Sequence, residues 1–150
     1  MSDEMGDEGQ GSHNAKRSIT VLHIEDDTYV RAMTAAALPL MNRSFPAEDW
    51  PTVQVIEAED GLTGVAKAKE HLPDVVLMDV RLPKLDGLRA AAEIRDDPQT
   101  RHIPIIFLTV FGDEGVEEAA ARAGTRRVIQ KPFRWDELMR AIVEVTDHHG

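Results

Sequence analysis

The chain has 150 residues, a formal net charge of −10 and no cysteine, with 42% hydrophobic and 29% charged residues, as expected for one globular domain with a single core. The acidic balance argues against a nucleic-acid-binding surface, and the lack of cysteine excludes disulfides and thiolate metal sites. No apolar stretch approaches the roughly 20 residues of a membrane helix, and no secretory signal is visible, so we expect a soluble cytoplasmic domain.

The chain begins with a polar, acidic segment, Met1 to Arg17, which has too few apolar residues to repay its ordering entropy and is expected to be disordered. From Ser18 onward, strand and helix patterns alternate five times, up to a short tail at 147–150. The predicted strands are 19–24, 53–58, 75–79, 103–108 and 127–130, and the predicted helices are 28–38, 61–71, 87–95, 114–123 and 134–146. This alternation predicts βαβ units, a parallel sheet and helices on both of its faces.

Three residues are predicted to mark helix ends. Asp60 and Asp113 each precede a helical pattern and are predicted N-caps, and Gly124 follows one and is a predicted C-cap.

One connection, residues 38–52, is longer than the usual 2–6 residues or so of such units. Its three prolines prevent it from being helical throughout, and Phe45 and Trp50 give it apolar anchors. We expect an extended loop packed on the surface of the domain. A partner-binding role is the alternative.

Polar side chains follow four of the predicted strands. Asp79 ends the apolar run 75–78, the acids at 25–27 follow the first strand, and Thr109 and Lys131 follow the last two. Because the carboxyl ends of parallel strands share one edge of the sheet, where such folds bind ligands, we expect these groups to meet.

Carboxylates grouped in this way suit Mg²⁺ or Mn²⁺. Without a cation, two carboxylates about 5 Å apart repel by roughly 3 kcal/mol at an effective dielectric near 20. An aspartate can attack phosphorus to form an aspartyl-phosphate, and a lysine and a hydroxyl can stabilise the charge on the transferred group. The pattern therefore predicts a site that handles phosphoryl groups.

With these features the chain resembles the receiver domain of two-component response regulators, over about residues 18 to 146. The matching motifs are Glu25-Asp26-Asp27, Met78-Asp79 with Leu82-Pro83 and Asp86-Gly87, Leu108-Thr109, and Lys131-Pro132-Phe133. The resemblance implies a flavodoxin-like α/β fold, a doubly wound five-stranded parallel sheet of order 2-1-3-4-5 with five helices.

The resemblance also implies a role for each matching residue. Asp79 would accept the phosphoryl group. Asp26, Asp27 and Asp79 would bind Mg²⁺ (or Mn²⁺), with the backbone carbonyl of Arg81 as a further ligand. Thr109 would be the switch hydroxyl. Lys131 would pair with the acids and then with the phosphoryl oxygens, aimed by a cis bond before Pro132.

Two positions depart from the family pattern. Val128 stands where members often carry an aromatic switch residue, and Val110 stands where a small residue is usual and could crowd the phosphoryl group. Phe111 is then the predicted moving side chain.

The function expected is a stand-alone, phosphorylation-controlled switch that receives phosphate from a sensor histidine kinase or phosphotransfer protein. Its chemistry would be limited to phosphorylation and dephosphorylation of Asp79, and output would come from contact with another protein through the fourth helix, fifth strand and fifth helix. Alternatives are a receiver excised from a longer regulator or hybrid kinase, a phosphohydrolase, disfavoured by Arg81 two residues after Asp79, and a phosphate-independent receiver. A homodimer stays open, and no nucleic acid or membrane partner is expected.

Overall fold

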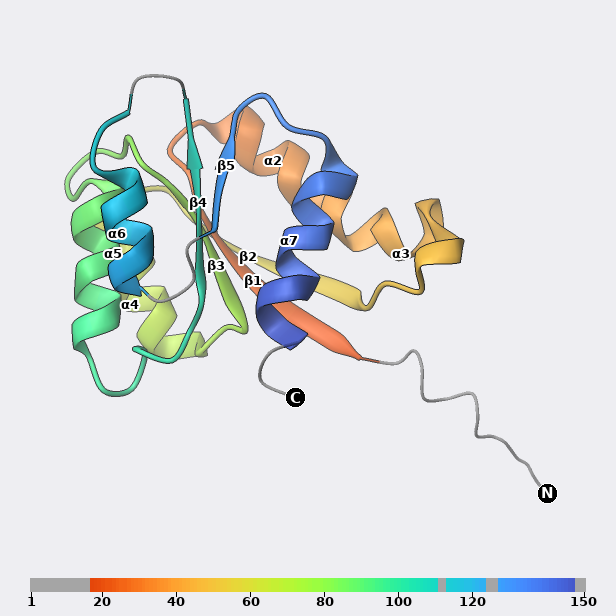
Figure 1. Ribbon diagram of the computed structural model, residues 1–150, viewed down its shortest axis with the longest axis horizontal. Coiled ribbons are helices and arrows are strands. Elements are labelled where there is room, and N and C mark those ends of the chain that lie inside the picture. The colour runs from red at the N-terminus through yellow and green to blue at the C-terminus, as the bar shows by residue number, and fades with distance from the viewer. Residues whose placement is uncertain (1–16, 111–112, 124–126, 148–150) are drawn as a thin grey trace.

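The computed structural model describes residues 17–110, 113–123 and 127–147, and contains one parallel sheet of five strands (Figure 1). The order across the sheet is β2-β1-β3-β4-β5, which confirms the predicted doubly wound arrangement. The strands are β1 (Ser18–Ile24), β2 (Thr52–Ala58), β3 (Val75–Asp79), β4 (Ile105–Thr109) and β5 (Arg127–Gln130).

The central strands are continuous apolar runs because helices cover both of their sides. Every residue of β3 and of β4 is buried. In the parallel register, Ile24 pairs with Met78, and Asp79 pairs with Leu108. The strands therefore end close to one another, at the carboxyl edge of the sheet.

Helices form a layer on each face of the sheet (Figure 1). The long helices are α2 (Thr28–Ala37), α4 (Gly61–His71), α5 (Gly87–Asp96), α6 (Val116–Ala123) and α7 (Trp135–Asp147). One core lies between the sheet and α4, α5 and α6, and includes Ile24, Met78 and Phe107. The other core lies on the side of α7 and includes Leu77 and Ile106. Alternate residues of the same strands thus supply both cores.

Carboxylates cap the starts of three helices. Asp60 accepts a hydrogen bond from the Thr63 amide at 2.7 Å, which confirms its predicted role at α4. Asp27 caps α2 and Asp86 caps α5 in the same way. The prediction for Asp113 was wrong, because α6 begins only at Val116 and the Asp113 carboxylate has other partners, described below.

The segment between α2 and β2 is more helical than its prolines suggested. It contains the short helix α3 (Met41–Ser44) and two 3-10 turns, η1 (Leu38–Leu40) and η2 (Pro46–Glu48). Trp50 is buried in the core on the α7 side, as expected of an anchor, whereas Phe45 is 37% exposed and lies against Trp50, with 5.3 Å between ring centroids. The segment is packed onto the domain as a series of short turns.

Some predictions fall outside the described residues, namely the disordered tail over 1–16, the cap at Gly124 and the tail at 148–150. Among the helices that the structure describes, none has both the length and the apolar character needed to cross a membrane.

Candidate functional site

The carboxyl edge of the sheet collects the polar groups that the sequence indicated. Asp79 and Thr109 are the last residues of β3 and β4, Glu25 follows β1 and Lys131 follows β5. Asp79 is 8% exposed and Glu25 is 2% exposed, so both carboxylates are largely removed from water.

Lys131 follows β5, at one side of the sheet, and its side chain reaches the acids at the ends of β1 and β3. Its Nζ is 3.3 Å from Glu25 Oε1 and 3.3 Å from Asp79 Oδ2. Burial opposes the charge on this amine, but Asp79 and Glu25 outweigh that effect and raise the pKa of Lys131 above its ordinary value. The Lys131–Pro132 peptide bond is cis, as expected. The site therefore contains a fixed cation beside the central carboxylate.

Three acids lie close enough to share a metal ion. One carboxylate oxygen from each of Glu25, Asp26 and Asp79 lies within 4.8 Å of the others. Burial raises the pKa of Glu25 to about 7, and the neighbouring Asp79 carboxylate adds to the rise. Grouped carboxylates are the hard oxygen donors that Mg²⁺ prefers, so the residues present fit that ion.

Asp27 was predicted to be a metal ligand, but its carboxylate has another role in the structure. Its Oδ1 accepts a hydrogen bond from the Val30 amide at 3.0 Å and so caps α2, and Asp27 is not part of the acid group above. Glu25 takes its place in that group. The reason is that Asp27 directly precedes α2 and caps it, whereas Glu25 and Asp26 lie between Asp27 and the end of β1.

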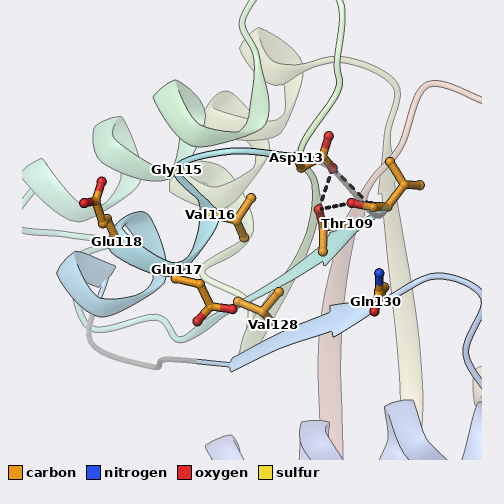
Figure 2. A pocket seen from close by; sticks show the side chains of 9 residues that line it. Thr109, Asp113, Gly115, Val116, Glu117, Glu118, Val128 and Gln130 are labelled. Atoms are coloured by element: carbon orange, nitrogen blue, oxygen red, sulfur yellow. Dashed lines mark hydrogen bonds between the residues drawn. The ribbon is translucent and has the colours of Figure 1, made fainter.

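Thr109 is engaged by a neighbouring acid (Figure 2). Its hydroxyl donates to Asp113 Oδ2, which also accepts from the Val110 amide at 3.0 Å. Arg81 Nε donates to Asp113 Oδ1 at 2.7 Å. The Thr109 hydroxyl and, against the cost of burial, the Arg81 guanidinium hold the pKa of Asp113 below its ordinary value. Arg81 also contacts the central acid, because its backbone amide donates to Asp79 Oδ1 at 3.2 Å.

A groove of about 570 Å³ lies beside Thr109, between β5 and the start of α6 (Figure 2). Val128 from β5 and Val116, Glu117 and Glu118 from α6 are among the residues that line it. Val110 is 40% exposed. Phe111, the predicted moving side chain, lies outside the described residues.

Sequence reasoning missed the contact role of Asp113 and assigned no ligand role to Glu25. A local pattern presents Asp113 as an ordinary cap of the helix that follows it, whereas its carboxylate turns back to Thr109 and to Arg81, which is 32 residues away in sequence. For Glu25 a signal existed, because it is the first acid after a buried strand.

Comparison with known proteins agrees with this geometry. Residues 21–143 match the response regulator receiver domain family. The chain is 39% identical to the polar-differentiation response regulator DivK of Brucella anthropi over 80 residues, which make up 53% of this chain and 65% of DivK. The match to this curated relative thus spans less than two thirds of its length.

Solved structures share the whole fold. The receiver domain of a sensor histidine kinase from Pseudomonas aeruginosa, described with a magnesium ion coordinated in its active-site cleft, is 32% identical, with a TM-score of 0.70 over 87% of this chain and 98% of that one. The response regulator domain of CheB from Thermotoga maritima is 28% identical, with a TM-score of 0.68 over 87% and 98% of the two chains. On sequence and on structure alike, the chain belongs to the response regulator receiver domain family of two-component signalling.

Proposed function

We propose that this protein is a phosphorylation-controlled switch that accepts a phosphoryl group on Asp79 from a sensor histidine kinase or a phosphotransfer protein. The observation that carries the proposal is the contact of Lys131 Nζ with both Asp79 and Glu25, at 3.3 Å each, at the carboxyl edge of the sheet. This contact gives the central carboxylate a cation that the phosphoryl oxygens can use after transfer.

In the transfer, a carboxylate oxygen of Asp79 attacks phosphorus, an oxygen–phosphorus bond forms, and the phosphorus–nitrogen bond of a phosphohistidine donor breaks. The negative charge on the transferred group needs fixed donors. Lys131 supplies a positive charge, the Thr109 hydroxyl can donate one hydrogen bond, and the Arg81 amide already donates to Asp79. Hydrolysis of the acyl phosphate by water then resets the switch.

Asp26 and Asp79 are the proposed protein ligands of Mg²⁺ (or Mn²⁺), with Glu25 beside them and the Arg81 backbone carbonyl as a further ligand. Asp27 is not retained, because its carboxylate caps α2. When bound, the divalent ion neutralises the acids and the charge of the incoming phosphate.

The output of the switch is proposed to be contact with a downstream protein through α6, β5 and α7. The groove between β5 and α6 adjoins Thr109, so a movement of Thr109 would alter this surface directly.

Incubation with acetyl phosphate and Mg²⁺, followed by intact-protein mass spectrometry, tests the assignment. We predict that the wild type gains one phosphoryl group and that Asp79→Asn gains none, because an amide is not nucleophilic. Asp49→Asn, an exposed acid before β2, is the matched control and should be labelled like the wild type. Labelling of Asp79→Asn would refute the proposal.

Calorimetry of Mg²⁺ binding tests the ligand set. We predict that Asp26→Asn weakens the affinity by at least about tenfold, because it removes a charged ligand. Asp27→Asn keeps a good helix cap and should bind Mg²⁺ nearly as the wild type does. The reverse ranking would show that Asp27, not Asp26, is the ligand.

A further inference from the structure

Asp113 is a buried carboxylate in the loop between β4 and α6. Its side chain is only 4% exposed, yet it carries a charge. Three donors from three residues compensate for that burial, namely the Thr109 hydroxyl, the Val110 amide and Arg81 Nε. Buried charges persist where they are paired in this way, so the cluster is a defined polar contact inside the loop.

The contact uses the hydroxyl that the phosphorylated state requires. A threonine has one hydroxyl proton to donate. In the structure Thr109 directs it to Asp113, with the Val110 carbonyl oxygen at 3.2 Å as a second acceptor (Figure 2). A phosphoryl group on Asp79 must therefore compete with Asp113 for this proton.

Arg81 links the same contact to the phosphoacceptor. Its backbone amide donates to Asp79, and its guanidinium donates to Asp113. The loops that follow β3 and β4 are thus joined across the site by Asp113.

We propose that Asp113 is a positioning residue that restrains Thr109 in the unphosphorylated protein by accepting its hydroxyl proton in competition with the phosphoryl oxygens. This inference rests on the proposed roles of Asp79 and Thr109. The Thr109 hydroxyl is bound to Asp113 in the unphosphorylated state and must leave it to donate to a phosphoryl group. Because this contact stabilises only the unphosphorylated state, it lowers the affinity of the site for a phosphoryl group. Removal of the contact raises that affinity.

Beryllofluoride with Mg²⁺, which mimics a phosphoryl group on aspartate, is the probe. Its apparent affinity is measured by NMR titration for the wild type and for Asp113→Ala. The variant should bind about tenfold more tightly, which corresponds to about 1.4 kcal/mol and is close to the lower end of the range for a hydrogen bond to a charged group.

Loss of a negative charge would by itself favour an anionic probe, so two controls are needed. Glu114→Ala removes the next acid of the same loop, which is exposed, and should have a much smaller effect. In a Thr109→Ala background, Asp113→Ala should change the affinity only as much as Glu114→Ala does. In a Thr109→Ser background, which restores a hydroxyl, the tenfold gain should return.

Equal gains with and without the hydroxyl at position 109 would overturn the inference, as would a folded Asp113→Ala with unchanged affinity. Asp113→Asn keeps the side-chain shape and accepts more weakly than a carboxylate, so it should show a smaller gain that also depends on the hydroxyl. If Asp113→Ala does not fold, the affinity of Asp113→Asn for the probe decides whether Asp113 restrains Thr109. Failure of the wild type to bind the probe would overturn the proposed function together with the inference, whereas normal wild-type binding isolates the role of Asp113.

Discussion

His23 lies in β1, between β2 and β3 in the sheet, with 1% of its surface exposed. Neither ring nitrogen has a hydrogen-bond partner within the described part of the chain. Burial lowers the pKa of His23 to about 3, and the positive charges of Lys131 and Arg31 add to the shift, so the ring is neutral at pH 7. An unsatisfied buried polar group costs about 1–3 kcal/mol, which the rest of the domain must offset.

We predict that His23→Leu raises the free energy of unfolding by about 1–2 kcal/mol at pH 7, because it replaces the unpartnered ring with an apolar side chain of similar size. As pH falls below 6.5, the unfolded state takes up the histidine proton while the folded state does not. Wild-type stability should therefore lose up to about 1.4 kcal/mol per pH unit from this residue, and the variant should lack that loss. Denaturant unfolding at pH 7, 6 and 5 measures both effects.

His71→Gln is the control, since His71 lies exposed at the end of α4, and it should change stability by no more than about 0.5 kcal/mol. A destabilised His23→Leu, or an advantage that does not grow as pH falls, would show that the ring has a partner in solution.

Among the elements, β3 and β4 were predictable because burial on both faces leaves a clear apolar run. β3 has the predicted bounds, whereas β4 begins at Ile105 rather than at 103. Ile103 is buried, which extends the apolar signal, but Pro104 has no amide hydrogen for the ladder. The apolar pattern indicates which residues are buried. A buried residue joins the hydrogen-bond ladder of the sheet only where the backbone has an amide hydrogen to donate.

Helix starts were predictable only where the cap contact is local. Asp60 and Asp113 look alike in sequence, and Asp60 binds the amide three residues later, within reach of a local rule. Asp113 instead binds Arg81, which is 32 residues away in sequence. The helix and strand periods of the sequence contain no signal for a contact between residues so far apart in the chain.

The same limit applies to the three consecutive acids after β1. The sequence indicates that acids reach the site but not which of them do, because the three acids lie in the turn between β1 and α2, where no strand or helix period fixes the side-chain directions. The start of α2 takes Asp27, and Glu25 and Asp26 are left for the site.

The prolines after α2 were expected to keep that segment from being helical throughout, and it consists of short helical pieces. Pro39 and Pro46 lie in the first turns of η1 and η2, where the missing amide hydrogen has no intrahelical partner to lose. Pro is thus compatible with a chain that turns repeatedly in short helical pieces.

On the scale of the whole molecule, the site and the 38–52 segment lie at opposite edges of the sheet. Trp50 precedes β2 by two residues and so sits at the amino edge, whereas Asp79 ends β3 at the carboxyl edge. Trp50 lies in the same core as Leu138 and Ile142 of α7, and the Arg140 guanidinium lies 6.0 Å from its ring centroid. The segment therefore ties α7 to the body of the domain at a distance from the carboxyl edge of the sheet.

We predict that Trp50→Ala lowers the free energy of unfolding by about 3 kcal/mol, as expected for removal of a large buried aromatic side chain. Phe45→Ala, which removes the partly exposed neighbouring ring, should cost only about 1 kcal/mol. Because neither residue lies at the carboxyl edge, both variants should accept phosphate from acetyl phosphate at the wild-type rate while they remain folded. Urea unfolding followed by far-UV circular dichroism gives the stabilities, and mass spectrometry gives the labelling rates. Slower labelling of a folded Trp50→Ala would show instead that the segment reaches the site through α7, and equal costs for the two variants would mean that Trp50 is not the anchor.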